Sequence, residues 1–476
     1  MKKLFYNSLS VVLCFFMLFA LASCHNVWDS MWYRENNDFL KESYIMPLTY
    51  SVSYTRLHDP SVYYDKDSGL YYAFGTHFAV SKSADLINWE VVNKEGDAVG
   101  LYGTSDWRGV LKVSSEFVGD NGGIKSTWAP DVIKFGNQYF MYYALTSEFG
   151  KGKSVIGRVS SDCITGPYSN EEVLVYSNDD WWGEPNAIDP QVFYDKKGKL
   201  WMVYGSYFNG IYIKELYNAG NKIGLPKHEG FGKLLWHTGY SSGVEGPYIF
   251  YNAETDYYYL MVSEGNLQSN YNMRVARSKN PDGPYYDICG EDVATPRGKG
   301  NKIAGNYRFE GEVLGYAALG HNSVTKLNGQ YYVIYHRRSG FGSRIIQNYF
   351  SNVNTLVFNQ QGWPVMAPNN YYGETIGLVN ENDIVGEYDL VIHTPETIDD
   401  FIGSERYVLN PDHTIMHNGL SVGNWTLKEG FYVTLNIFDT TYHGCVLPQY
   451  VNYLNKNSFS ITATSNIGNP LWCNKL

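Results

Sequence analysis

Three acidic residues and one histidine stand at matching points of a phrase that recurs five times. Each copy has a proline (an asparagine in the last copy), a β-branched residue two positions later, a short turn and an aromatic-rich or apolar strand. Asp59, Asp189 and His321 directly precede that position, and Glu245 stands one residue further back in the fourth copy. Carboxyl groups packed into one concave site raise the pKa of at least one of them. The set therefore offers a protonated acid beside an ionised base, which hydrolysis of a glycosidic bond requires.

The elements that carry these residues are predicted β-hairpins, because each copy joins two strand-like segments through a Gly, Asn or Asp turn. The marker positions are 60, 130, 190, 247 and 322, so the repeats span 57 to 75 residues, enough for a four-stranded sheet. We therefore expect a five-bladed β-propeller over residues 49–375, whose innermost strands bring the four side chains to one mouth of the channel. A two-sheet sandwich is the alternative, but it gives no reason for five copies.

Composition supports an all-β, folded protein. The 476 residues include 43 Tyr, aromatic residues make up 16%, and no long segment shows helical periodicity, so few helices are expected. The net charge of −11, without a basic block, excludes a nucleic-acid binder. Short predicted strands in residues 385–476 indicate a small accessory β-barrel or sandwich.

The N-terminus has the features of an export signal. Lys2 and Lys3 precede an apolar run that ends in Leu-Ala-Ser-Cys24, which resembles a bacterial lipobox. We expect residues 1–23 to be removed, Cys24 to be lipidated and residues 24–48 to form a tether. The protein would then be lipid-anchored in a bacterial cell envelope, at the outer-membrane surface or in the periplasm. A cleaved signal with an incidental cysteine is the alternative.

Besides Cys24, four cysteines remain in the mature chain, at positions 163, 289, 445 and 473. No C-x-x-C spacing occurs, so a zinc or redox motif is not supported. Cys445 and Cys473 lie in one segment and could pair in an oxidising compartment.

Five ordered motifs together resemble glycoside hydrolase family 43: His58-Asp59-Pro60, Trp128-Ala129-Pro130-Asp131, Asn186-Ala187-Ile188-Asp189-Pro190, Glu245-Gly246-Pro247-Tyr248-Ile249 and Gly320-His321-Asn322-Ser323. The third and fifth motifs are similar to those of its endo-α-1,5-L-arabinanases. Residues 385–476 resemble the extra β domain of the longer extracellular members.

The resemblance implies a role for each motif residue. Asp59 would be the general base, Glu245 the general acid, and Asp189 would raise the pKa of Glu245 and orient it. The family inverts configuration, so the base and acid carboxyls should lie roughly 6.5–9.5 Å apart. His321 would bind a central metal ion, typically calcium, with waters in the remaining positions because calcium prefers oxygen.

Substrate contacts are implied as well. Asn186 and Ser206 would hydrogen-bond the sugar, Trp128 would stack on it, and Gly150 approximately matches a contact position. The segment Gly205-Ser206-Tyr207-Phe208 stands where members of the family often read Gly-Ser-Phe-Trp, so the platform ring differs. Asp131, one residue past its proline, is expected to face away from the site and make a structural hydrogen bond.

The resemblance implies a hydrolase that cuts within arabinan, the polymer of pectin side chains, and that binds arabinan and arabino-oligosaccharides. We expect the protein to be a monomer. Two alternatives stay open. One is an exo-acting α-L-arabinofuranosidase or β-xylosidase of the same family. The other is a non-catalytic glycan-binding lipoprotein, against which the presence of all three carboxyl groups argues.

Overall fold

The computed structural model describes residues 44, 46, 55–119, 126–150, 153–178, 183–237, 243–342 and 344–476. The expected signal sequence, Cys24 and the tether apart from Tyr44 and Met46 lie outside the described residues. Within these ranges, no helix is both long and apolar enough to cross a membrane.

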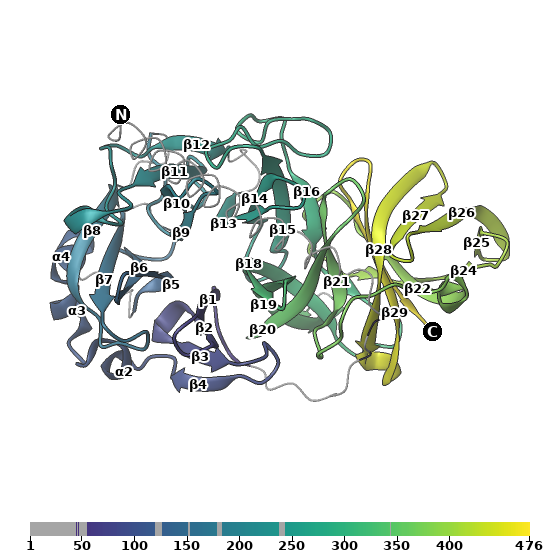
Figure 1. Ribbon diagram of the computed structural model, residues 1–476, viewed down its shortest axis with the longest axis horizontal. Coiled ribbons are helices and arrows are strands. Elements are labelled where there is room, and N and C mark those ends of the chain that lie inside the picture. Colours follow the sequence, from purple (N-terminus) through teal and green to yellow (C-terminus); the bar gives the residue numbers. More distant parts are fainter. Residues whose placement is uncertain are drawn as a thin grey trace, which may run out of the picture.

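Five sheets surround a common axis, each built from consecutive strands (Figure 1). Blade one comprises β1 (Ser61–Asp65), β2 (Leu70–Phe74), β3 (Val80–Ser83) and β4 (Glu90–Asn93). Blade two comprises β5 (Trp128–Phe135), β6 (Gln138–Thr146), β7 (Ser154–Ser161) and β8 (Ser169–Ser177). Blade three comprises β9 (Gln191–Tyr194), β10 (Leu200–Tyr204), β11 (Ile211–Leu216) and β12 (Lys233–Trp236).

Blade four comprises β13 (Val244–Asn252), β14 (Tyr257–Glu264), β15 (Asn272–Ser278) and β16 (Asn301–Ala304). Blade five comprises β18 (Gly315–Leu327), β19 (Gln330–Phe341), β20 (Arg344–Phe358) and β21 (Pro364–Asn370), with β17 (Tyr307–Arg308) beside β18. The predicted five-bladed propeller and its five inner hairpins are confirmed.

Helices are short, as expected: α2 (Ala98–Tyr102), α3 (Trp107–Val110), α4 (Lys112–Val118), α5 (Glu381–Ile384) and the 3₁₀ turns η2 (Thr76–Phe78), η3 (Gly220–Lys222) and η4 (Asn452–Leu454).

Aromatic side chains fill the wedges between neighbouring blades, which accounts for their abundance. Phe250 of blade four lies 5.6 Å from Tyr331 of blade five, and Tyr259 lies 5.2 Å from Phe358. Both faces of a blade are covered by its neighbours, so inner strands such as β6 are buried along almost their whole length. These strands therefore read as continuous apolar and aromatic runs instead of alternating ones.

Asp131 ties three blades together, as its position past the proline predicted. Its Oδ1 accepts the hydroxyl of Ser61 at 2.5 Å, and its Oδ2 accepts the backbone N–H of Val192 at 2.8 Å. Burial raises the pKa of this carboxyl to about 6.

The ring closes between blade five and blade one through side-chain contacts. Leu57 N–H donates to Ser351 Oγ at 3.0 Å, and Tyr71 OH donates to the Lys326 carbonyl at 2.6 Å. A shared apolar cluster covers the same seam, consisting of Val62, Tyr71, Leu86, Ile87, Tyr332, Ile334, Val353 and Tyr371.

The C-terminal segment forms a closed barrel, one of the two predicted alternatives (yellow in Figure 1). Its strands are β22 (Gly386–Ile392), β24 (Glu405–Leu409), β25 (Thr414–His417), β26 (Leu420–Lys428), β27 (Tyr432–Ile437), β28 (Thr440–Val451), β29 (Lys456–Ser465) and β30 (Pro470–Lys475). Strand β23 (Ile402–Gly403) leaves the barrel and pairs in parallel with β17 of blade five.

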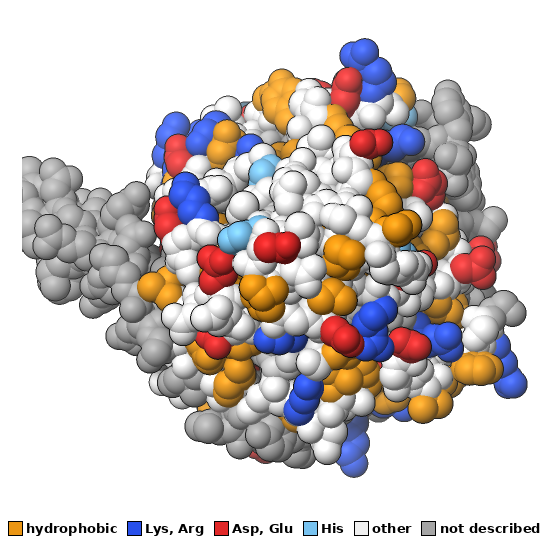
Figure 2. Space-filling view, turned by 90° about the vertical axis from the view of Figure 1, so that its right-hand side faces the viewer, with side chains coloured by type: hydrophobic (Ala, Val, Ile, Leu, Met, Phe, Trp, Pro, Cys, Tyr) orange, Lys and Arg blue, Asp and Glu red, His pale blue; other side chains and the backbone are white. Residues whose placement is uncertain are grey.

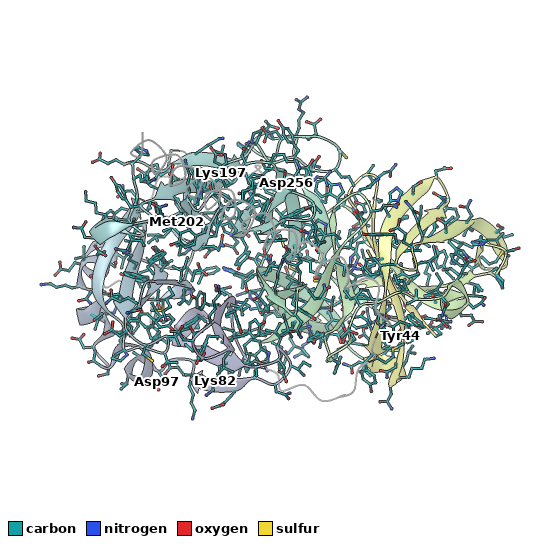
Figure 3. All side chains as sticks on the ribbon, in the orientation of Figure 1. Tyr44, Lys82, Asp97, Lys197, Met202 and Asp256 are labelled. Atoms are coloured by element: carbon teal, nitrogen blue, oxygen red, sulfur yellow. The ribbon has the colours of Figure 1, made fainter. Side chains whose placement is uncertain are left out.

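The barrel surface mixes residue types: seen from that side, hydrophobic side chains are interspersed with charged ones (Figure 2). Tyr44 lies beside the barrel (Figure 3), with its ring edge-on to Phe459 at 5.3 Å.

Cys445 and Cys473 are free thiols, so the pairing considered from the sequence is not formed. Cys445 is opposite Thr462 on β29, whereas Cys473 is opposite Ile461. Adjacent residues of a strand point to opposite faces, so the two sulfurs lie on opposite sides of the barrel wall.

Replacing Asp131 tests its bridging role. We expect Asp131→Ala to lower the free energy of unfolding by about 2–4 kcal/mol, because a hydroxyl and a buried N–H lose their acceptor. Asp131→Asn, which keeps an oxygen for Val192 N–H, should cost less. Chemical denaturation measures both, and equal losses would contradict the proposed bonding.

Candidate active site

Each blade has a residue in the left-handed region of backbone space just before or within its inner strand. The φ angles are +53° at Asp59, +38° at Ala129, +58° at Asp189, +57° at Gly246 and +50° at His321. The conformation accompanies a bulge in the inner hairpins of blades two, four and five. It turns the side chain at this point from the blade face towards the axis, where Asp59, Asp189 and His321 line one small cavity.

In four blades, the backbone N–H of the left-handed residue donates to a side chain of the preceding blade. Thr76 Oγ1 of blade one accepts Ala129 N–H of blade two at 2.9 Å. The three other bonds are Gly246 N–H to Asp189 Oδ2 at 3.1 Å, His321 N–H to Ser263 Oγ at 2.7 Å and Asp59 N–H to His336 Nδ1 at 3.2 Å.

Asp59 is almost fully enclosed, with 12% of its side chain exposed, and is surrounded by donors. Thr76 Oγ1 donates to its Oδ2 at 2.6 Å, and His58 Nδ1 lies 2.7 Å from the same oxygen. His321 Nδ1 lies 3.0 Å from Oδ1. Burial alone would raise the pKa of Asp59, but His58 and His321 outweigh it and hold this pKa well below its usual range. The carboxylate is thus ionised at neutral pH.

Glu245 has the opposite electrostatic character. Ser206 Oγ donates to its Oε2 at 2.7 Å, and Tyr271 OH donates to its Oε1 at 2.8 Å. Burial is the largest influence and raises the pKa of Glu245, with the Asp59 charge acting in the same direction, while Ser206, Tyr271 and His321 oppose the shift.

Asp189 is linked to Glu245 through the main chain. It accepts the N–H of Gly246, the residue after Glu245. Burial and the neighbouring Glu245 and Asp59 raise the pKa of Asp189 to about 7, against the influence of His321. Gly246 also makes room for the histidine, since a Cβ there would lie 3.1 Å from His321 Cγ.

His321 supplies the positive charge of the cluster. Burial would lower its pKa, but Asp59, Asp189 and Glu245 together outweigh burial and raise the pKa to about 9. One imidazolium among three carboxyl groups favours ionisation of the nearest one, Asp59.

The expected sugar-contacting residues occupy different environments. Asn186 is 6% exposed, and its Oδ1 is buried without a hydrogen-bond partner among the described residues. Trp128 is partly exposed, and its ring lies edge-on to that of Phe149 at 6.2 Å. Phe149 precedes Gly150, which is exposed. Ser206 donates its hydroxyl to Glu245.

Four residues of the site were not predicted: His58, Thr76, Tyr271 and His336. His58 is adjacent to Asp59 and could have been found by that adjacency. The other three lie outside the recurring phrase, so only the three-dimensional arrangement brings them to the carboxyl groups.

His58, Asp59 and His336 are close enough to form a metal-binding group within the described residues. However, His336 Nδ1 accepts the Asp59 N–H, and burial lowers the pKa of His336 well below its usual range. This nitrogen is therefore engaged in holding the backbone of the base, which does not favour a metal at that point.

Both domains of the chain match known protein families. Residues 49–364 match the glycosyl hydrolases family 43, and residues 368–473 match a C-terminal lipocalin-like domain. The chain belongs to glycosyl hydrolase family 43. This family 43 protein is accordingly a glycosidase, and the pKa values of Asp59 and Glu245 are shifted in opposite directions, as suits the base and acid of glycoside hydrolysis.

Relatives cover nearly all of this family 43 chain. An extracellular endo-α-(1→5)-L-arabinanase of Thermotoga petrophila is 39% identical over 454 aligned residues, covering 87% of this chain and 93% of that protein. A second such enzyme, from Bacillus subtilis, is 35% identical over 88% of this chain and 92% of its own length. The crystal structure of the endo-1,5-α-L-arabinanase of Thermotoga petrophila RKU-1 superimposes with a TM-score of 0.81 at 36% identity, covering 90% and 99% of the two chains.

Removing single hydrogen bonds should shift the pKa of Asp59 and the pKa of Glu245 independently. Ser206→Ala removes a bond that stabilises ionised Glu245, so the pKa of the acid should rise and the alkaline limb of the kcat/KM profile should move up by about one pH unit or less. Thr76→Val removes a bond to ionised Asp59, so the acidic limb should move up instead. Profiles in which both variants shift the same limb would contradict this assignment.

Proposed function

We propose that this protein hydrolyses α-1,5-L-arabinofuranosidic linkages within arabinan, an endo action with inversion at the anomeric carbon. The observation that carries the proposal is the pair formed by Asp59 and Glu245 at the start of two inner strands, with the pKa of Asp59 lowered and that of Glu245 raised. The similarity to named endo-arabinanases over most of the chain supports the choice of substrate.

Asp59 accepts a proton from a water molecule while the oxygen of that water attacks the anomeric carbon. Glu245 gives its proton to the departing glycosidic oxygen, so the bond breaks without releasing an alkoxide. Exchange with solvent then returns Asp59 to the ionised form and Glu245 to the protonated form.

The positions of Asn186 and Trp128 support sugar binding. The buried, unpartnered Oδ1 of Asn186 gains a partner when a sugar hydroxyl donates to it. The partly exposed Trp128 ring offers an apolar face to a furanose ring, and Gly150 borders the same edge.

The exo alternative has one relative in its favour, an extracellular exo-α-(1→5)-L-arabinofuranosidase of Cellvibrio japonicus, which is 28% identical over 65% of this chain. The endo-arabinanases of Thermotoga petrophila and Bacillus subtilis align over much more of the chain, including the barrel. We therefore propose endo action.

A calcium ion held by His321 is part of the proposal. Because Nδ1 of His321 lies against Asp59 Oδ1, a metal would bind at Nε2, and the imidazolium would release its proton from that nitrogen on binding. Asn322 Oδ1 and Ser323 Oγ are buried without partners in the described part of the chain, and both residues line the same axial cavity. Oxygen atoms and room for water suit calcium. When bound, the ion supplies positive charge beside the carboxyl groups.

The location is proposed from the N-terminal sequence. Curated relatives are named extracellular, which supports a site outside the cytoplasm. The Leu-Ala-Ser-Cys24 motif supports a lipid anchor that holds a monomeric enzyme at the cell envelope.

The product profile tests the activity. On linear arabinan the wild-type enzyme should release a ladder of arabino-oligosaccharides and should leave xylan intact. Asp59→Asn and Glu245→Gln should each lower kcat by about 100-fold or more while the fold is retained, because each removes one half of the acid–base pair. Single arabinose units as the first product would instead establish exo action.

Chelation tests the metal. Treatment with a strong chelator should lower kcat on arabinan by about 10-fold or more, and added calcium should restore it. His321→Ala should make the residual activity insensitive to both reagents. An unchanged wild-type rate after chelation would remove calcium from the proposal.

A further inference from the structure

The barrel packs against β21 of blade five, where Thr462 Oγ1 donates to the Met366 carbonyl at 2.6 Å. It also contacts the propeller through one extended segment, residues 394–401, which we call the strap. After β22 ends at Ile392 the chain leaves the barrel, runs along blades four and five, and adds β23 to blade five before it returns as β24. Phe401 fixes the end of the strap against two glycines. A Cβ at Gly315 would lie 2.3 Å from Phe401 Cδ1, and one at Gly340 would lie 2.8 Å from Phe401 Cζ.

Two buried cations of blade four bind the main chain of the strap. Arg274 Nη2 donates to the Pro395 carbonyl at 2.7 Å, and Lys302 Nζ donates to the Glu396 carbonyl at 2.7 Å. Both side chains are only 3% exposed. Arg274 also forms an ion pair with Glu264 at 2.5 Å. Buried charges require partners, so the strap carbonyls complete the surroundings of the two cations and fix the path of the strap.

The strap binds both ends of residues 265–271, the loop between β14 and β15, which we call the acid loop. At its start, Thr397 Oγ1 donates to Glu264 Oε1 at 2.8 Å. At its end, Asn270 Nδ2 donates to Asp399 Oδ1 at 2.9 Å, and Asn272 Nδ2 donates to Thr397 Oγ1 at 3.0 Å.

Asn306 joins the strap and the acid loop from a third side. Its Nδ2 donates to the Ser269 carbonyl of the acid loop at 2.9 Å and to the Asp399 carbonyl of the strap at 3.2 Å. Its Oδ1 accepts Ala318 N–H at 2.9 Å, three residues before His321. The two segments are therefore held as one unit against blade five.

The residue between the two strap-bound asparagines is Tyr271, which donates to Glu245 Oε1 at 2.8 Å. The Tyr271 ring is 1% exposed and lies over Gly320, where a Cβ would approach to 2.2 Å. The other end of the acid loop is also linked to Glu245. Tyr207 OH donates to the Gly265 carbonyl at 2.5 Å, and Ser206, the residue before Tyr207, donates to Glu245 Oε2.

We propose that the strap positions the acid loop, and through Tyr271 the Glu245 carboxyl group, so that the C-terminal barrel sets the geometry of proton donation from outside the propeller. Thr397 and Asp399 are the positioning residues, because their side chains bind the acid loop on both sides of Tyr271. The inference rests on the proposed role of Glu245 as general acid.

A misplaced acid has a particular kinetic signature. A sugar leaving group needs a proton, whereas a 2,4-dinitrophenolate leaves without one, so only the first reaction depends on the orientation of Glu245. General unfolding or a lost binding site would lower both reactions alike.

The experiment uses the full-length protein with Asp399→Ala, Thr397→Val and the double variant. Asp400→Ala is the matched control, because this exposed neighbour has the same charge. Asp399→Asn keeps an oxygen for Asn270 and should restore activity. On linear arabinan we expect the double variant to lose about 10-fold in kcat with KM within about twofold, since small displacements of a catalytic group are costly. On the 2,4-dinitrophenyl glycoside of arabinobiose it should stay within about twofold of wild type.

Glu245→Gln is the reference for complete loss of the acid, with a large loss on arabinan and a small one on the dinitrophenyl substrate. Equal losses of the strap variants on both substrates, or Asp399→Ala behaving like Asp400→Ala, would overturn the inference while leaving the role of Glu245 intact. Normal turnover of arabinan by Glu245→Gln would instead overturn the proposed function and the inference with it. Melting temperatures of all variants separate a loss of folded protein from a loss of rate.

Discussion

The left-handed residue just before or within each inner strand is the constraint on which the site depends. This conformation costs about 1–2 kcal/mol for a residue with a Cβ atom, so it persists only where the surroundings enforce it. Here the enforcement comes from the neighbouring blade, whose side chain accepts the N–H of the strained residue in four of the five blades. Because the acceptors Thr76 and Asp189 belong to the site themselves, the interactions that close the ring also build its chemistry.

Burial and one imidazolium then give similar carboxyl groups different tasks. Asp59 receives two histidines and a hydroxyl, which hold its pKa well below the usual range, whereas burial keeps the pKa of Glu245 raised against its two hydroxyl donors. Burial pushes both pKa values upwards, so the difference arises from the positions of His58 and His321. Gly246 contributes by having no side chain, because the His321 ring occupies that space.

The recurring phrase was enough to predict the propeller, since five similar hairpins need five similar places around an axis. The same phrase identified Asp59, Asp189, Glu245 and His321, because equivalent positions on different blades converge. Tyr271, Thr76 and His336 could not be found this way, because they lie after the aromatic run of the phrase, at positions where the copies share no residue type. The path of residues 394–401 was also beyond prediction, since it depends on two buried cations that bind main-chain carbonyls, to which any residue type can contribute.

The seam between blades one and five gives the molecule a defined mechanical weak point. Every other neighbouring pair of blades is joined by continuous chain, whereas this pair meets through non-covalent contacts of the described residues, namely hydrogen bonds, an apolar cluster, an ion pair and ring stacking. Asp59 lies at this seam, with its backbone bound to His336 and its carboxylate to His321, both of blade five. Separation of the two blades would thus break the contacts that orient and ionise Asp59 while all five sheets remain intact. Closure of the ring is therefore also a condition for an active Asp59.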